Sequence, residues 1–267
     1  MHPRVDRDDI PSNGGCFRPV TATLPARSVV NPSTPAPVNA RAGTVKLLCA
    51  PIITAFADCM PDRIPAPSAH IATFMAFGGV RADGTPFVAN QAMMGGAGAS
   101  ATADGVEFIE TDVTNGRHGG VEVVELSAPV RIRRYELRTN GGGQGMHRGG
   151  CGAVREIEFL VDGVKVSYRG ERHFHPAPGL HGGSPGLPSR ATVRRSDGRT
   201  EEIQSKAVVV LNRGDVLICE SAGGGGWGDP ARRSAHAAQL DISTGKVTLD
   251  ADTRASGAGS RQPERRP

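Results

Sequence analysis

Aromatic side chains and long hydrophobic runs are what this sequence lacks most clearly. Its 267 residues include one Trp, two Tyr and eight Phe. No run of about 18 apolar residues is present, so no segment is predicted to cross a bilayer as a helix. The amino-terminal stretch MHPRVDRDDIPSNGG is polar and interrupted by Pro, which is unlike a secretory signal. We therefore expect a cytoplasmic protein with no membrane partner.

Paired cysteines and a strong net charge are missing as well. The five Cys are odd in number and have no CxxC spacing, so the pattern indicates reduced thiols rather than a disulfide framework or a zinc ribbon. Thirty-one basic residues against 27 acidic ones give a net charge of +4. The Arg-rich segments 131–134 and 190–195 alternate with apolar residues and have no stacking aromatics between them, so we expect no nucleic-acid partner.

Glycine and proline are what the sequence has in excess. It contains 36 Gly and 20 Pro without a G-X-Y period, which excludes a collagen-like chain. The hydrophobic fraction of 38% and the small net charge also exclude a fully disordered chain. We expect residues 1–43 to form an extended, Pro-rich segment that packs on the core, and residues 251–267 to form a disordered tail.

One segment has clear helical periodicity. Between 44 and 60, apolar residues recur every three to four positions, which predicts the principal helix of the chain. Thr44 is an acceptable N-cap, and Pro51 is expected to kink or split the helix.

Beyond residue 71 the pattern changes to short strands separated by glycine turns. Asp-Gly pairs at 83–84, 104–105, 162–163 and 197–198 are turn signals, and VDGV (161–164) is the clearest predicted hairpin. A further short helix and then a strand are expected in 234–250, and a short strand in 16–24. The sequence therefore predicts a β-rich α+β fold of many short strands joined by Gly-rich loops. The predicted strands are 71–80, 86–94, 121–138, 153–161, 164–170, 191–195, 206–211 and 215–221.

Four glycine clusters, at 93–100, 139–152, 179–186 and 221–230, are the candidate sites of chemistry. Glycine lets successive N–H groups converge on an anion, but the same clusters are equally typical of tight loops that close short strands. Neither the GxxxxGK[ST] pattern nor a dinucleotide-binding βαβ unit is present. We therefore expect that this chain alone binds no nucleotide.

The segment GERHFHPAPGLHGG (170–183) gathers polar residues without a recognised metal spacing. His173 and His175 could share one side of a strand and ligate a metal with a carboxylate, but no HExxH pattern occurs. A polar loop is the alternative interpretation, and we assign no metal site. Arg172 offers a planar fork for a substrate anion. Cys151 and Ser184 are only weak candidates for a nucleophile, so the catalytic residues stay unassigned.

Read together, these segments resemble the carboxy-terminal half of the hydantoinase B/oxoprolinase family, which includes the B subunit of ATP-dependent N-methylhydantoinases. Four motifs carry the resemblance and occur in the family's order: DDIPSNGGCFRPV with VNPSTPAPVNAR (8–41), YELRTNGGGQGMHRGGCGAVREIEFL (135–160), GERHFHPAPGLHGGSPG (170–186) and SAGGGGWGDPARR (221–233). The glycine-loop signature consists of Gly149, Gly150, Gly223, Gly224, Gly225, Gly226, Gly228 and Asp229.

The resemblance implies a function and an organisation. Residues 44–250 correspond to the family's carboxy-terminal region, and nothing matches its amino-terminal half. We therefore expect a subunit, or a fragment of one, of an ATP-dependent cyclic-amide hydrolase of the 5-oxoprolinase or N-methylhydantoinase type. The alternatives are a subunit of a related ketone carboxylase and an inactive truncated remnant.

The resemblance also implies partners and site residues. An A-type subunit would bind ATP, a divalent metal is expected in the complete assembly, and the amino-terminal half could be a further partner. Phosphorylation of a cyclic amide's oxygen would make the ring carbon electrophilic, and anion-stabilising groups would then help to open the ring. We expect Arg148, Arg172 and His173, with the glycine-loop amides, to line the substrate side.

Overall fold

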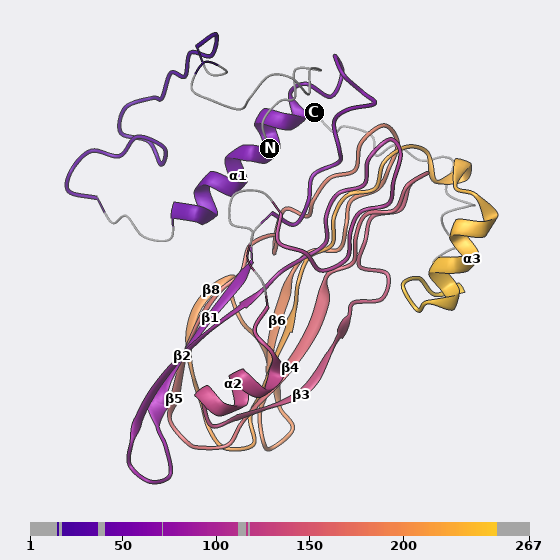
Figure 1. Cartoon of the computed structure of the whole chain (residues 1–267). Helices are drawn as coiled ribbons and strands as arrows, with labels where there is room; N and C mark the ends of the chain where they lie inside the picture. Colours follow the sequence, from indigo (N-terminus) through magenta and orange to yellow (C-terminus); the bar gives the residue numbers. More distant parts are fainter. Residues whose placement is uncertain are drawn as a thin grey trace, which may run out of the picture.

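The hydrophobic core lies between two antiparallel sheets. The structure is a computed structural model and describes residues 15, 18–36, 41–70, 72–111, 116 and 118–249. Within this part of the chain, the first sheet has the order β2-β1-β5-β8 and the second the order β3-β4-β9-β6-β7 (Figure 1). The strands of the first sheet are β1 (Thr73–Val80), β2 (Pro86–Met93), β5 (Val164–Arg169) and β8 (Lys206–Leu211). Those of the second are β3 (Val130–Leu137), β4 (Ala153–Phe159), β6 (Arg190–Arg194), β7 (Thr200–Glu202) and β9 (Val216–Glu220). The prediction of a β-rich fold with short strands is confirmed.

Alternation along the strands builds the core. Every second residue of β5 is buried, as expected for a strand with one face on a core. Phe77 of β1 and Phe159 of β4 meet edge to face, with ring centroids 5.5 Å apart. Both rings are fully buried, so the inner faces of the two sheets share one core. The short helix α2 (Val121–Ser127) contacts β2 and β3 and buries Val124 against this core.

The principal helix is present, but its bounds differ from the prediction. Helix α1 spans Arg41–Thr54 with Pro51 inside it, so Thr44 is not its N-cap. Lys46 of α1 is buried and forms an ion pair with Glu110. Apolar side chains on the same segment face outward, since Ile52 is 61% exposed and Phe56 is 50% exposed. The periodic apolar residues thus do not pack on the sheets of this chain.

Three of the four Asp-Gly signals mark turns or bends, and only two of these close hairpins, whereas Asp104–Gly105 lies in a segment without a turn. Gly84 (φ 85°) joins β1 to β2, and Gly198 (φ 90°) joins β6 to β7. The hairpin predicted at 161–164 is wrong, because β4 and β5 belong to different sheets. Gly163 does adopt φ 69°, and its N–H donates to Oδ1 of Asn212. The Asp-Gly sequence thus determines the backbone angle at this turn, but it does not determine whether the strands before and after the turn pair with each other.

Three further expectations need correction. The strand predicted over 121–138 begins only at Val130, because residues 121–127 form α2 and Pro129 separates the two. In 234–250 the helix α3 (Ala235–Ser243) is present, but the described residues after it contain no strand. Residues 18–24 form no strand either. The tail predicted for 251–267, and residues 1–14, 16–17 and 37–40 of the predicted Pro-rich segment, lie outside the described residues.

Candidate functional site

The glycine clusters do not form separate loops; they meet in one bundle of extended segments. This glycine bundle continues from one end of the sheets (Figure 1) and consists of residues 66–69, 94–99, 141–152, 177–187 and 221–228. Backbone hydrogen bonds join its segments: Gly96 N–H donates to Ala222, Gly224 N–H to Gly150 and Gly150 N–H to Ala97, at 2.8–3.0 Å. Sequence-distant clusters are therefore parts of one structural unit.

Close packing, rather than unusual backbone angles, explains the glycines. A Cβ on Gly96, Gly150 or Gly224 would collide with the backbone of a neighbouring segment. Of the bundle's glycines, only Gly182 and Gly228 have positive φ. Glycine fills the crowded axis of collagen for the same reason, because no other residue leaves room for three chains to approach. The repeated glycines of the family motif thus specify a backbone packing.

The backbone N–H groups of the glycine-loop signature already form hydrogen bonds within the glycine bundle. The N–H groups of Gly149, Gly150, Gly223, Gly224, Gly225, Gly226 and Gly228 all donate to backbone carbonyls. They are therefore not free to stabilise an oxyanion in this conformation. Asp229 closes the motif differently: its Oδ1 accepts a hydrogen bond from Ala231 N–H at 2.9 Å and caps the short 3-10 helix η3 (Pro230–Arg232).

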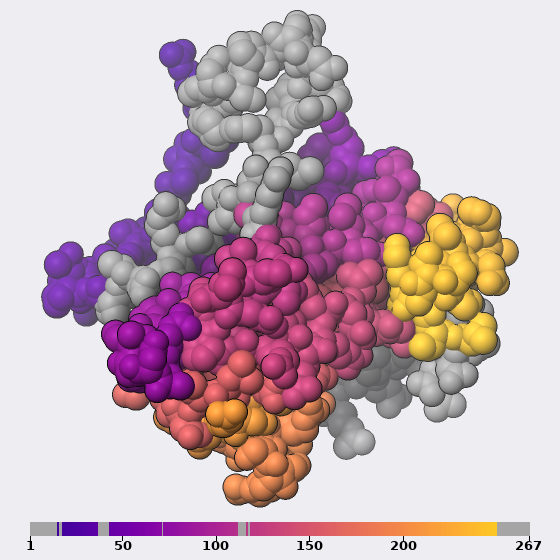
Figure 2. All heavy atoms as spheres, turned by 60° about the horizontal axis from the view of Figure 1, so that its bottom comes forward, coloured from indigo at the N-terminus to yellow at the C-terminus, as the bar shows by residue number. Residues whose placement is uncertain are grey.

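Arg148 lies inside a buried ionic network that fastens α3 to the bundle. It is 3% exposed, its Nη2 lies 2.6 Å from Glu107 Oε1, and its Nε lies 3.2 Å from Asp241 Oδ1. Asp241 also pairs with Arg233 at 2.6 Å, and Arg233 binds both carboxylate oxygens of Asp104 at 2.8 Å. In the space-filling view α3 stands on the flank of the body, where this network holds it (Figure 2).

The network shifts the pKa values of Asp104, Glu107 and Arg148 toward the charged forms. Burial alone would raise the pKa of Glu107, but the hydrogen bond and charge of Arg148 outweigh burial and lower it. The pKa of Asp104 is lowered against burial by Arg233 and by the Arg148 N–H. The pKa of Arg148 is raised, since Glu107 outweighs its burial. The assignment of Arg148 to anion binding stays a prediction, and these contacts favour a structural role.

Arg172 and His173 are adjacent in the chain but bind different neighbours. Arg172 has φ 61° and donates from Nη2 to the Ser68 carbonyl at 3.2 Å and from Nη1 to the His175 carbonyl at 3.3 Å. Its Nε is buried without a partner, and burial lowers its pKa. His173 Nε2 lies 3.0 Å from the Tyr168 hydroxyl, and burial, then Lys206, lowers its pKa.

Of the three predicted site residues, Arg172 has the guanidinium best placed for an anion. It has no carboxylate partner among the described residues, in contrast to Arg148. The structure gives no contact between Arg148 and either Arg172 or His173 within its described part. The predicted trio is therefore not a single preformed pocket.

The nucleophile and metal candidates have no geometry that supports them. Cys151 is buried, and burial with the charge of Glu107 raises its pKa. The Ser184 hydroxyl accepts a hydrogen bond from Gln144 N–H at 2.7 Å. Over the described ranges, no group of three or more His, Cys, Asp or Glu side chains could hold a metal ion. No helix in the same ranges is long and apolar enough to span a membrane.

Sequence reasoning missed a second cluster, at the point where the sheets pass into the bundle. His118, Tyr135 and Arg155 lie together there, and all three carry buried polar atoms without a hydrogen-bond partner. One signal was available: in AVREIEF (153–159), Arg155 falls on the same alternating face as the apolar Ala153 and Ile157. An arginine on an inward strand position marks a buried charge.

Comparisons with known proteins match most of the chain. The family model described as "Hydantoinase B/oxoprolinase" matches residues 3–230. The protein "5-oxoprolinase 1" of Arabidopsis thaliana is 36% identical over 221 residues, which cover 82% of this chain and 16% of that protein. The crystal structure of ATP-dependent caprolactamase from Pseudomonas jessenii matches with a TM-score of 0.82 and 28% identity, over 93% of this chain and 45% of that chain.

A nucleotide-free structure of acetone carboxylase shares the fold. Its TM-score is 0.67 at 20% identity, over 76% of this chain and 31% of that one. The chain thus spans less than half the length of these relatives.

Proposed function

Since the chain belongs to the hydantoinase B/oxoprolinase family, we propose that it forms the carboxy-terminal part of a B-type subunit in an ATP-dependent cyclic-amide hydrolase. One observation carries the proposal: 93% of the chain is similar in structure to ATP-dependent caprolactamase, with a TM-score of 0.82 and 28% sequence identity. The related 5-oxoprolinase also takes its name from a cyclic amide.

In this proposal a partner subunit activates the cyclic amide with ATP, and this chain takes part in opening the ring. The carbon–nitrogen bond of a lactam resists water because it is delocalised, and transfer of a phosphoryl group to the amide oxygen makes the ring carbon electrophilic. By membership of this family we expect an A-type partner subunit to bind ATP, and the absence of a nucleotide-binding motif from this sequence agrees with that division. The described residues fit no divalent metal, and no step of this proposal passes through one.

This chain would contribute a rigid scaffold and an anion contact. The glycine bundle fixes the backbone beside Arg172, whose guanidinium has only carbonyl partners and an unused, buried Nε. A preorganised cation that faces developing negative charge lowers the barrier to ring opening. In the complete enzyme, Arg172→Ala would therefore lower turnover or substrate affinity. Unchanged values of both would remove Arg172 from the site.

Four free cysteines among the described residues, Cys49, Cys59, Cys151 and Cys219, fit a reducing compartment, and we propose the cytoplasm.

Reconstitution tests the proposed function. The chain would be co-expressed with an A-type subunit and the amino-terminal region of a relative, and the purified complex assayed for ATP hydrolysis. We expect 5-oxoproline, a hydantoin or caprolactam to stimulate phosphate release, while acetone with bicarbonate does not. Stimulation by acetone with bicarbonate alone would favour the carboxylase alternative. A confirmed complex that none of these compounds stimulates would indicate an inactive remnant.

A further inference from the structure

Arg155 lies at the end of the two sheets that faces the glycine bundle, and its guanidinium has no carboxylate partner among the described residues. Arg155 occupies an inward position of β4 and is 2% exposed. Its Nη1 donates to Oε1 of Gln91 at 3.4 Å, and its Nε is buried without a partner. No described carboxylate forms an ion pair with it, so among the described residues the charge is balanced only by the Gln91 amide and the face of the Tyr135 ring. Such a charge strongly disfavours the folded state unless an opposite charge neutralises it.

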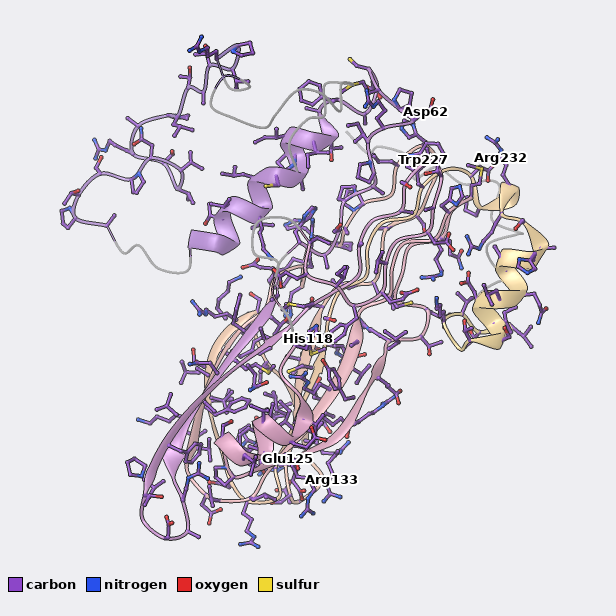
Figure 3. The ribbon with its side chains drawn as sticks, in the orientation of Figure 1. Asp62, His118, Glu125, Arg133, Trp227 and Arg232 are labelled. Carbon is purple, nitrogen blue, oxygen red and sulfur yellow. The ribbon has the colours of Figure 1, made fainter. Side chains whose placement is uncertain are left out.

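Two further groups with unused polar atoms border Arg155. Tyr135 pairs with Arg155 across β3 and β4, the guanidinium carbon lies 4.0 Å from the ring centroid, and the buried hydroxyl makes no well-formed hydrogen bond. His118 stacks on Phe108 with ring centroids 4.1 Å apart, and its two buried ring nitrogens lie near the backbone of Ala92 and Phe108 without a well-formed hydrogen bond. Figure 3 shows His118 where the sheets pass into the bundle.

We propose that Arg155, Tyr135 and His118 form a binding site for a carboxylate. Each of the three can donate a hydrogen bond, through a guanidinium fork, a phenolic O–H and an imidazole N–H. One carboxylate accepts several such bonds and carries the single negative charge that neutralises Arg155. A cation would be repelled by Arg155, and a neutral ligand would leave its charge uncompensated.

The electrostatics of His118 agree with this assignment. Burial first, and the charge of Arg155 second, lower the pKa of His118, so the ring is neutral at pH 7 and offers one N–H. Arg155 then supplies the only positive charge of the cluster. The exposed Arg133 of β3, by contrast, already pairs with Glu158 at 2.8 Å and needs no further anion.

The carboxylate can come from two sources. It can belong to a small molecule, or to an Asp or Glu side chain of the amino-terminal region that the longer relatives possess. The site itself does not depend on the proposed hydrolase activity, because binding is measured without turnover.

The first arm of the test measures binding of free carboxylates to the full chain. Acetate and 5-oxoproline would be titrated at constant ionic strength, with the neutral acetamide and 2-pyrrolidinone as matched controls. We expect the carboxylates alone to raise the Tm and to shift the Arg155 Nε–H resonance. Arg155→Met would weaken binding by about tenfold or more, whereas the exposed Arg131→Gln would not. Arg155→Met is expected to fold, because an apolar side chain replaces an uncompensated charge.

The second arm measures affinity between this chain and the amino-terminal region of a relative. If a side-chain carboxylate occupies the site, Arg155→Met and Tyr135→Phe weaken assembly, Arg131→Gln does not, and acetate competes. Carboxylate-dependent stabilisation in the first arm assigns the site to a small molecule, and selective loss of assembly in the second assigns it to the amino-terminal region. If carboxylates neither bind selectively nor affect assembly through Arg155, the proposal is overturned.

Discussion

Gly224 and Ala97 lie so close together that a Cβ on Gly224 would approach the Ala97 carbonyl oxygen to less than 3.0 Å, a separation that real Cβ atoms essentially never show. The two residues are 127 positions apart in the sequence. Gly224 also donates its N–H to Gly150, and Gly150 donates to Ala97. Three segments therefore converge at a point where only glycine leaves enough space.

The first prediction concerns this contact. Gly224→Ala forces backbone segments apart and should destabilise the chain by about 3 kcal/mol or more, at the upper end of the cost of overpacking. Gly119→Ala is the matched control, because a Cβ there meets nothing within 4 Å and the residue has no positive φ. Urea unfolding followed by circular dichroism measures both. Equal midpoints for the two variants would contradict the close packing of the bundle.

The second prediction concerns the ionic network under α3. Asp241→Asn keeps the side-chain shape but removes the charge that Arg148 and Arg233 share, and it should cost about 1–3 kcal/mol because each arginine loses one of its two carboxylate partners. Glu202→Gln breaks an exposed pair with Arg190 and should change stability by less than about 1 kcal/mol. Thermal unfolding of both variants measures the two changes in stability. Equal losses of stability would show that the ionic network does not stabilise the fold.

The third prediction is a loss of stability in acid. The folded-state pKa values of Asp104 and Glu107 lie below their ordinary values of 3.8 and 4.5. As the pH falls past these ordinary values, the unfolded chain binds protons that the folded chain does not yet bind, so the free energy of unfolding decreases. The stabilisation is fully present only well above pH 4.5, the ordinary pKa of Glu107, and is lost as the pH falls toward the lowered pKa values of the folded state.

A variant with both Asp104→Asn and Glu107→Gln isolates this effect. It should be less stable than the native chain at pH 7, and its stability should decrease less between pH 5 and pH 3, because two of the titrating groups are gone. Urea midpoints across this range give the comparison. Parallel curves for the two proteins would show that neither carboxylate is linked to folding.

The sequence predicts most of the longer strands of this fold because their signals are local, but it misses the three-residue β7. Alternating burial in segments such as 164–169 follows directly from side-chain direction in a strand. Pairing is not local: β4 pairs with β3 and β9, so the Asp-Gly turn after it leads into the other sheet. Likewise, Val121 and Val123 favour a strand by propensity, but packing of Val124 beside β2 and β3 makes this segment a helix.

The candidate site could be predicted only in part. The glycine motifs identified the family, which is confirmed. Their spacing did not show that the clusters pack on one another, because the partners of each glycine lie far away in the sequence. Arg148 stands out in its motif, yet its carboxylates, Glu107 and Asp241, come from segments with no motif. The inward position of Arg155 could be inferred from the alternation in 153–159, but its lack of a described carboxylate partner becomes evident only in the structure.

The most direct test of the central claim is the ratio of ring-opened product to phosphate in the assembled enzyme. This chain, an A-type subunit and the amino-terminal region would be mixed with ATP and 5-oxoproline, a hydantoin or caprolactam, and both products followed by NMR. The account predicts equal amounts of the two products with at least one of these amides, and none when this chain is omitted. Ring opening at an undiminished rate without this chain, or phosphate release with no ring opening of any of them, would contradict it.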